Sequence, residues 1–152
     1  MYSQPNRLAS YGRIANTETN PLKQIVMLYD GAIKFLNLTA ADIESGDLIA
    51  KAEHSGRAFD IIGYLQSILD FERGGDVAVS LDNLYRSITV LALRASAELD
   101  ASLMRRAAEL LVPVRDAWET NASQMNVQAD VTVNAAPEAA TAAPSLALGT
   151  AF

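Results

Sequence analysis

Few side chains in this sequence could perform chemistry, and His54 comes first because it is the only histidine. A di-iron site inside a helical bundle would need a Glu-x-x-His motif, and the residue three positions before His54 is Lys51. A Ser–His–acid set would need His54 as its base, and no hydrolase signature surrounds it. We therefore expect His54 to be a solvated residue on a helix.

Clustered carboxylates could bind a cation. Asp42, Glu44 and Asp47 gather where one expected helix ends and the next begins, but their spacing is not that of an EF-hand loop. Asp70 and Glu72 flank a glycine pair, and we expect both to be solvated. The sequence has no cysteine, which excludes disulfides and thiolate metal sites. We expect neither a metal nor a cofactor.

The glycine pair Gly74-Gly75 could belong to a phosphate-binding loop. No strand is predicted before it and no Lys-Ser/Thr pair follows it, so a helix–helix turn is favoured. Tyr29, Tyr64 and Tyr85 fall at helical positions and are expected to be core residues with outward hydroxyl groups, not catalytic acids. With no nucleophile and base in place, we expect no enzymatic activity.

Composition limits the partners. The chain has 152 residues, half of them hydrophobic, and a formal net charge of −6, which suit one domain with a sizeable core. The longest basic run is Arg105-Arg106, so nucleic acid and anionic membrane surfaces are disfavoured. Residues 1–7 lack the apolar core of a signal peptide, and no segment has about 18 consecutive apolar residues. We expect a cytoplasmic protein without membrane insertion.

Apolar residues at helical spacing predict an all-α protein, an antiparallel four-helix bundle with short turns. Asn20 and Pro21 form a helix start, and Gly46 ends that helix. Asp47, Asp76 and Asp100 are expected to cap the other helices. The predicted helices span approximately residues 21–45, 48–72, 76–98 and 101–119.

Outside the helical bundle, predicted at residues 20–119, the chain has two flanking segments. Residues 1–19 are polar and expected to be weakly ordered, either as a frayed end or as a cap that docks on the bundle. Residues 120–152 are rich in Ala, Thr and Pro, and we expect a disordered tail. Pro113 should bend the last helix without dividing it. Trp118 is either a packing residue or an interface anchor.

The first helix is apolar on two faces. Besides its main stripe, Leu28, Phe35 and Leu38 lie on a second face, and Gly31 between them would let a neighbour approach closely. Either this helix is central to its bundle, or another polypeptide helix docks on its second face. The helices together carry more apolar surface than one small core needs, which favours a partner site.

Several segments of the sequence, taken in order, resemble the flagellin-export chaperone family, FliS. The similarity runs from about residue 8 to residue 119, and the tail and Pro113 fall outside the family pattern. The matching segments are Thr17-Glu18-Thr19-Asn20-Pro21, Met27-Leu28-Tyr29-Asp30-Gly31-Ala32-Ile33, Glu72-Arg73-Gly74-Gly75-Asp76, Leu84-Tyr85 and Ala117-Trp118.

This resemblance implies a cytoplasmic bundle that binds the disordered C-terminal region of flagellin. Such chaperones prevent premature filament polymerisation and deliver the subunit to the type III flagellar export apparatus, where a component of the export gate is a second partner. In the family an N-terminal segment covers part of the partner site and is displaced, and Leu8 and Tyr11 match that segment.

Helical spacing, not the resemblance, selects six residues for a client-binding groove. The alternative function is a non-catalytic adaptor bundle that self-associates through the same apolar faces, so the free protein is expected to be a monomer or a homodimer. The predicted groove residues are Leu28, Phe35, Ile61, Leu65, Val90 and Leu93.

Overall fold

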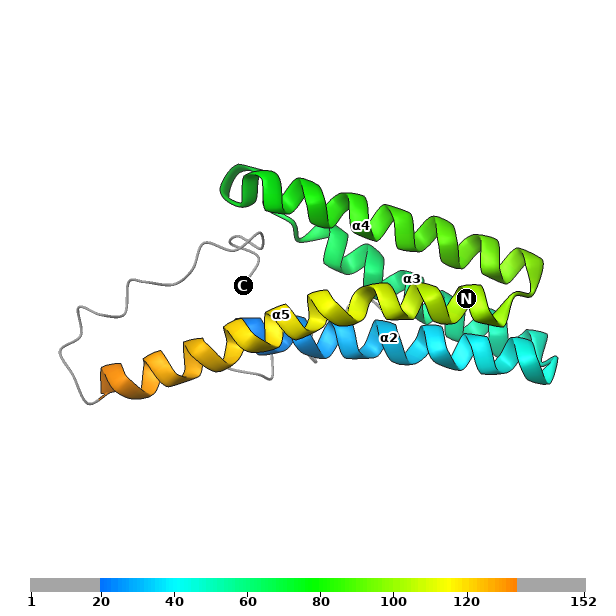
Figure 1. The fold of residues 1–152 in the computed structure, drawn as a ribbon, viewed down its shortest axis with the longest axis horizontal. Coiled ribbons are helices and arrows are strands. Elements are labelled where there is room, and N and C mark those ends of the chain that lie inside the picture. Colours follow the sequence, from blue (N-terminus) through cyan, green and yellow to red (C-terminus); the bar gives the residue numbers. More distant parts are fainter. Residues whose placement is uncertain (1–19, 134–152) are drawn as a thin grey trace, which may run out of the picture.

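The structure is a computed structural model that describes residues 20–133, with side chains described as far as Met125. The described chain forms four helices, which confirms the predicted all-α bundle (Figure 1). They are α2 (Pro21–Ser45), α3 (Leu48–Ser67), α4 (Phe71–Glu98) and α5 (Ala101–Val133).

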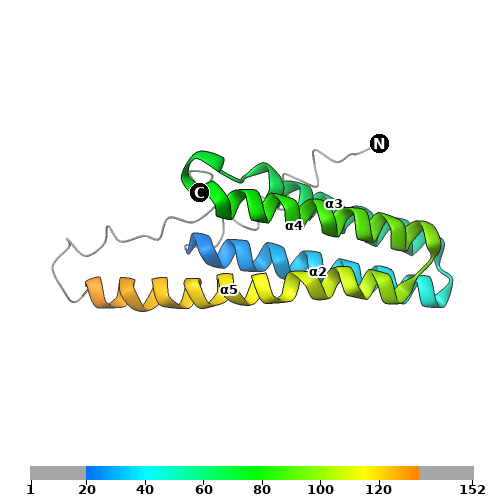
Figure 2. The ribbon, with the colours of Figure 1, turned by 45° about the horizontal axis from the view of Figure 1, so that its top comes forward.

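Helix α2 lies at the centre of the helix packing. It makes extensive contacts with α3 and with α5, whereas α4 packs against α5 and, less closely, against α3. Figures 1 and 2 show consecutive helices running in opposite directions, with α2 and α5 side by side. Because Leu28 is buried within the chain, the second apolar face of α2 is at least partly explained by its central position.

The start and end of α2 are those that the sequence predicts. The Asn20 side chain accepts hydrogen bonds from the backbone N–H groups of Leu22 (3.0 Å) and Lys23 (3.4 Å), and Pro21 occupies the first helical position. Gly46 ends the helix in the left-handed conformation, with φ of 75°. The two flanking residues therefore fix the length of α2.

Two of the other predicted caps are also confirmed. The Asp47 carboxylate accepts from the backbone N–H of Ala50 at 3.0 Å, at the start of α3. The Asp100 carboxylate accepts from Leu103 at 2.9 Å, at the start of α5. These bonds satisfy backbone donors that have no partner inside a helix.

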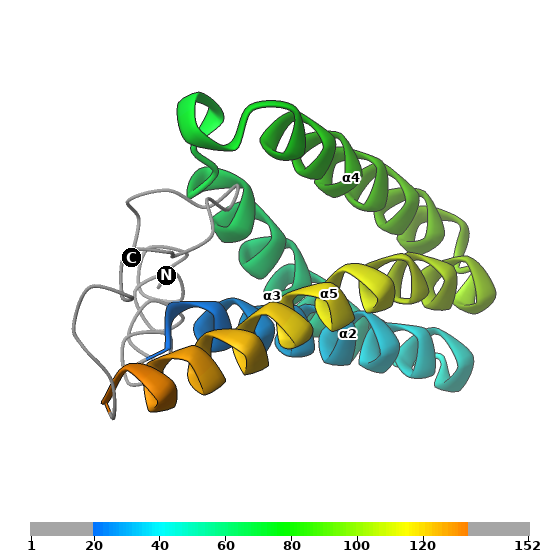
Figure 3. The same cartoon turned by 60° about the vertical axis from the view of Figure 1, so that its left-hand side comes forward.

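The predicted boundary between α3 and α4 is wrong. Helix α3 ends at Ser67 and not near residue 72, and α4 is capped by Asp70 and not by Asp76. The Asp70 carboxylate accepts from the N–H groups of Glu72 and Arg73, both at 3.0 Å, so one helical turn forms ahead of the glycine pair. Gly75 then interrupts α4 with φ of 50° and ψ of −126°, which gives the bend at the start of α4 in Figure 3.

The predicted end of the last helix, residue 119, is also wrong, because α5 continues to Val133. Trp118, Ala122 and Met125 follow at helical spacing and pack on the core, and Ala122 is only 1% exposed. The Asn20 amide donates a hydrogen bond to the Ala122 carbonyl at 3.1 Å, which joins this extension to the start of α2. The helix is continuous through Pro113, as expected.

The core lies between α2 and the three other helices, and small residues allow close packing. A Cβ atom added to Gly31 would lie 3.1 Å from Ile61 Cδ1, which confirms the predicted close approach of a neighbour. The largest fully buried side chains include Tyr29, Tyr85, Leu36 and Leu111.

Candidate partner-binding surface

The outer face of α4 carries apolar side chains that no described part of the chain covers. Val79, Val90 and Leu93 are 50%, 65% and 53% exposed. At about 100° of rotation per residue, the three share one face of the helix, opposite the fully buried Tyr85 and Ile88. We call Val79, Val90 and Leu93 the outer α4 face.

Charged residues on and beside the outer α4 face are already paired within the helix. Arg86 Nε lies 3.0 Å from Asp82 Oδ2, and Arg94 Nε lies 3.1 Å from Glu98 Oε1, each at i,i+4 spacing. By the same rotation Arg86 lies on the face between Val79 and Val90, so the face is an apolar surface interrupted by one charge that is paired with Asp82. Exposed apolar side chains gathered on one face are typical of a contact site for another polypeptide.

The six predicted groove residues do not line one open surface. Leu28, Ile61 and Leu65 are 4%, 2% and 0% exposed and belong to the core. Val90 and Leu93 lie on the outer α4 face. A client could touch the three core residues only if something that now covers them moved, so the structure separates the predicted set into buried and accessible members.

Phe35, the sixth predicted groove residue, lies half-buried at the contact of α2 with α3. Its ring stacks on the His54 ring, with centroids 6.1 Å apart and an angle of 27° between the planes. The Arg57 guanidinium and the Lys34 ammonium lie 5.6 Å and 5.7 Å from the Phe35 centroid. These cations partly shield the ring from solvent.

The expectation that His54 is simply solvated is wrong. Its Nδ1 atom lies 2.6 Å from Asp42 Oδ2, and its side chain is only 28% exposed. Helical spacing alone could not show that the turn at Gly46 folds α3 back so that His54 meets Asp42. The pair joins α2 to α3, which gives His54 a structural role.

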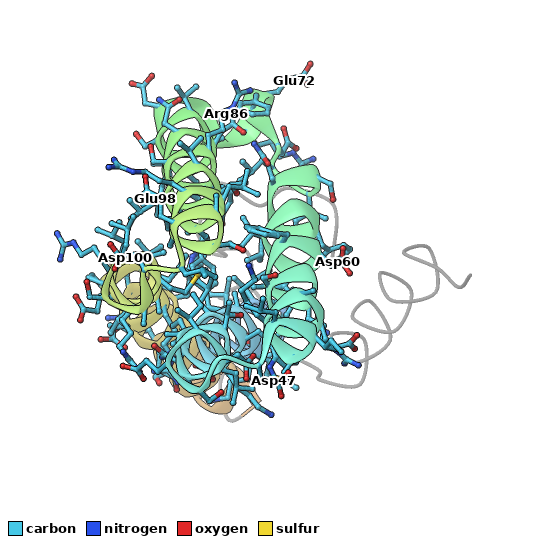
Figure 4. All side chains as sticks on the ribbon, turned by 90° about the vertical axis from the view of Figure 1, so that its right-hand side faces the viewer. Asp47, Asp60, Glu72, Arg86, Glu98 and Asp100 are labelled. Carbon is cyan, nitrogen blue, oxygen red and sulfur yellow. The ribbon has the colours of Figure 1, made fainter. Side chains whose placement is uncertain are left out.

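A second set of exposed apolar residues lies at the end of the bundle where α2 and α4 finish. Leu48, Ile49 and Leu99 are 53%, 86% and 49% exposed. Asp47 and Asp100, which Figure 4 labels, mark the two turns at this end. Leu48 and Leu99 follow the core-facing spacing of their helices in the sequence, but each lies next to a turn, and the structure leaves both about half exposed.

Polar contacts hold the two turns together. Arg105 on α5 donates to both carboxylate oxygens of Glu44 on α2, at 2.9 Å and 2.5 Å. This exposed ion pair lowers the pKa of Glu44, chiefly through the hydrogen bond from Arg105. Lys51 on α3 donates to the Ser96 carbonyl on α4 at 3.1 Å. The end of the bundle is thus a connected surface made by all four helices.

The buried tyrosines differ from expectation in the direction of their hydroxyl groups. Tyr29 and Tyr85 are core residues, as predicted, but their hydroxyl oxygens point at each other, 2.6 Å apart. Burial raises the pKa of both hydroxyl groups, and the neighbouring Tyr29 raises that of Tyr85 further. Both groups therefore stay neutral near pH 7.

Among the side chains that the structure describes, no three His, Cys, Asp or Glu residues are placed to hold a metal ion. In residues 20–133, no helix is both long enough and apolar enough to cross a bilayer. Leu8 and Tyr11, the predicted cap, lie outside the described residues.

Comparison with known proteins places most of the chain in one group. A family model described as "Flagellar protein FliS" matches residues 4–125. The flagellar secretion chaperone FliS of Vibrio cholerae is 34% identical over 100 residues, which are 66% of this chain and 74% of that protein. The flagellar secretion chaperone FliS of Salmonella typhimurium is 35% identical over 101 residues, 66% of this chain and 75% of its own.

A third relative, the flagellar secretion chaperone FliSB of Pseudomonas aeruginosa, is 32% identical over 103 residues, 68% of this chain and 82% of that protein. The family match spans α2, α3 and α4 and continues along α5 to Met125. It therefore includes the part of α5 beyond residue 119 that packs on the core, and it also includes Leu8 and Tyr11.

Proposed function

The chain belongs to the FliS family of flagellar secretion chaperones, and we propose that its client is the disordered C-terminal region of flagellin. In this proposal the chain acts in the cytoplasm, where it prevents premature polymerisation of flagellin. It then delivers the subunit to the type III flagellar export apparatus, where an export-gate component would be its second partner.

The observation that carries the proposal is the uncovered outer α4 face. An unfolded client can form an amphipathic helix whose apolar side lies along Val79, Val90 and Leu93. Ordering such a client costs about 2–5 kcal/mol of the contact energy. Burial of apolar area at about 25 cal/mol per Å² can offset that cost without any catalytic group.

The predicted cap supports a way to regulate client access. Leu8 and Tyr11 would cover part of the client site in the free protein and leave it when the client binds. If the residues they cover include Leu28, Ile61 and Leu65, displacement of the cap would expose apolar surface that is now buried. Phe35 would contribute at the edge, beside Arg57 and Lys34.

Titration calorimetry with a C-terminal flagellin fragment tests the proposal. We expect one-to-one binding with a large negative change in heat capacity, because apolar surface is buried as the client folds. Val90→Asp should weaken binding, and Ser80→Asp is the matched control, because Ser80 is an exposed residue on another side of α4. An N-terminal flagellin fragment should not bind at comparable concentration.

Size-exclusion chromatography of the same samples separates the two candidate functions. A chaperone should elute as a heterodimer with the fragment. A stable homodimer that ignores the fragment would instead support the self-associating adaptor, and Val90→Asp would then dissociate that dimer. If Tyr11→Ala alters client binding while helix content is unchanged, the cap is supported, whereas unfolding would make Tyr11 a core residue.

A further inference from the structure

We propose that the outer α4 face is covered in cis by the C-terminal segment of the same chain that contains Leu146, Leu148 and Phe152. Two observations support this proposal. The structure leaves an apolar face without a described neighbour, and the sequence beyond Val133 ends in a second apolar group that the helices do not use.

The direction of α5 brings the tail to the end of the bundle where α4 begins. Helix α5 packs on α4 and runs antiparallel to it, so Val133 lies toward the Gly75 end of α4 (Figures 1 and 2). Helix α2 is packed on α3 and α5 instead. A chain that leaves the end of α5 therefore starts at the end of the bundle where α4 begins, although α4 and α5 diverge toward that end and the start of α2 lies beside α5 there (Figures 2 and 3).

The length of the intervening chain fits this face. At about 1.5 Å per residue, α5 rises about 48 Å from Ala101 to Val133, and Val90 lies about 14 Å from the turn that joins α4 to α5. Val90 is thus about 34 Å along the axis from the end of α5. At about 3.3 Å per residue, the chain from Val133 spans up to about 43 Å to Leu146 and up to about 63 Å to Phe152, which exceeds this axial offset.

The same estimate disfavours the other apolar set. Leu99 lies about 48 Å along the axis from the end of α5, beyond the span of about 43 Å available to Leu146. Leu48 and Ile49 lie at that same end of the bundle. Of these two surfaces, the outer α4 face is the one whose axial offset lies within the span of all three apolar residues of the segment; Phe71 and Val77, 51% and 58% exposed, lie at the start of the same helix.

Charge also favours this occupant. Beyond Val133 the sequence contains Glu138 as its one charged residue, and none lies between Leu146 and Phe152. The charges on and beside the outer α4 face are already paired as Arg86–Asp82 and Arg94–Glu98. A neutral apolar segment can therefore bind without leaving a charge unpaired or bringing like charges together.

Docking of the tail does not depend on the proposed function, but its effect on client binding does. If a flagellin segment uses the outer α4 face, the tail and the client compete for it, and the tail makes binding weaker in the free chaperone. Tail docking itself requires no client, so the two ideas can fail separately.

Directed disulfide formation tests the docking in the full-length chain. The sequence has no cysteine, so Arg86→Cys with Ala147→Cys introduces a single pair and keeps every apolar residue of both partners. Ser87→Cys with Ala147→Cys is the matched control, since Ser87 is exposed and about 100° further round the helix. Both pairs have nearly the same tether, so their effective concentrations are equal unless the tail is docked.

We expect the Arg86→Cys pair to close within the monomer on the order of ten times faster than the control pair, because docking raises the local concentration on one face only. Equal rates for the two pairs would overturn the inference. Crosslinked dimers as the main product would also overturn it, since a second copy would then be the occupant.

Client affinity provides the second readout. Leu146→Asp combined with Leu148→Asp should abolish the rate difference and tighten binding of the flagellin fragment several-fold. If these substitutions abolish the rate difference but leave client affinity unchanged, the tail docks on the outer α4 face and the client binds elsewhere. If the two cysteine pairs close at equal rates without the Leu146 and Leu148 substitutions, and the client still binds tightly, the chaperone function is supported and docking of the tail is wrong.

Discussion

The hydroxyl oxygens of Tyr29 on α2 and Tyr85 on α4 lie 2.6 Å apart in a fully buried contact. The rings are 6.3 Å apart, with an angle of 51° between their planes. One polar contact thus joins α2 to α4 at the centre of an apolar core. Its strength depends on both hydroxyl groups staying protonated.

Alkaline pH should weaken the fold through this pair. Burial raises the pKa of both tyrosines above the ordinary value of 10.0, so the folded chain holds these protons after the unfolded chain has released them. The stabilisation is complete below pH 10 and falls as the pH rises further. Urea unfolding at about pH 9 and about pH 11 should show a loss that is smaller in the Tyr29→Phe/Tyr85→Phe variant.

Removing one hydroxyl should cost more than removing both. Tyr29→Phe leaves the buried Tyr85 hydroxyl without the partner that it has in the structure, at a cost of about 1–3 kcal/mol in the free energy of unfolding. Adding Tyr85→Phe removes the unsatisfied group and should restore part of the loss. Denaturant titrations check this, and a double variant less stable than Tyr29→Phe would contradict it.

Asn20 should contribute more than a helix cap. It caps α2 with its side-chain oxygen and donates its amide to the Ala122 carbonyl at 3.1 Å. Asn20→Ala should cost about 1–2 kcal/mol in the free energy of unfolding, whereas Asn20→Ser keeps a capping oxygen and should lose less. Asp47→Ala is the control, because Asp47 is an exposed cap; an equal loss there would argue against the contact with Ala122.

The two left-handed helix ends should respond oppositely to substitution. Gly46 and Leu99 both have positive φ, 75° and 55°, but only Gly46 is suited to it. Leu99→Gly should stabilise the chain by up to about 1 kcal/mol, since Leu99 is half exposed and loses little packing. Gly46→Ala should destabilise it by about 1 kcal/mol. Thermal unfolding of both variants tests the pair.

Substitution by alanine should affect stability differently at two helical glycines, because only one of them has space for a Cβ atom. A Cβ atom at Gly63 meets nothing within 4 Å, so Gly63→Ala should stabilise α3 by about 0.5–1 kcal/mol through helix propensity. At Gly31 the new Cβ would lie 3.1 Å from Ile61 Cδ1, so Gly31→Ala should gain less or be destabilising. Chemical denaturation decides this, and equal gains at both sites would contradict the close contact.

Local signals in the sequence were sufficient to predict most of the helix boundaries. Asn20-Pro21, Gly46-Asp47 and Asp100 are short-range stop and start signals, and each one lies where the structure begins or ends a helix. The predicted start of α4 was wrong because Asp70 caps the helix one turn before the more conspicuous Gly74-Gly75. Two competing local signals cannot be ranked without their three-dimensional surroundings.

The predicted end of α5 was wrong for a different reason. Residues 120–133 contain many polar side chains and one charged residue, Asp130, and their composition resembles that of an unfolded segment. Contacts with α2, through Ala122 and Asn20, favour the helical state there, and the sequence shows them only as the short apolar spacing of Trp118, Ala122 and Met125.

The candidate surface was predicted only in part. Helical spacing correctly separates Val90 and Leu93 from the main stripe of α4, and the structure leaves both exposed. The same spacing could not show that α3 covers the second face of α2, which is why Ile61 and Leu65 are core residues in the structure. Periodicity identifies faces of a helix, but the packing of neighbours decides which faces remain open.

Trp118 is the single tryptophan of the chain, is 5% exposed and lies beside Tyr29. Its fluorescence consequently originates from one place, the contact of α5 with α2, and excitation of the two buried tyrosines can transfer to it. The molecule therefore contains its own optical probe of helix association. A shift of its emission to longer wavelength would signal separation of α5 from α2 during unfolding or client exchange, without any attached dye.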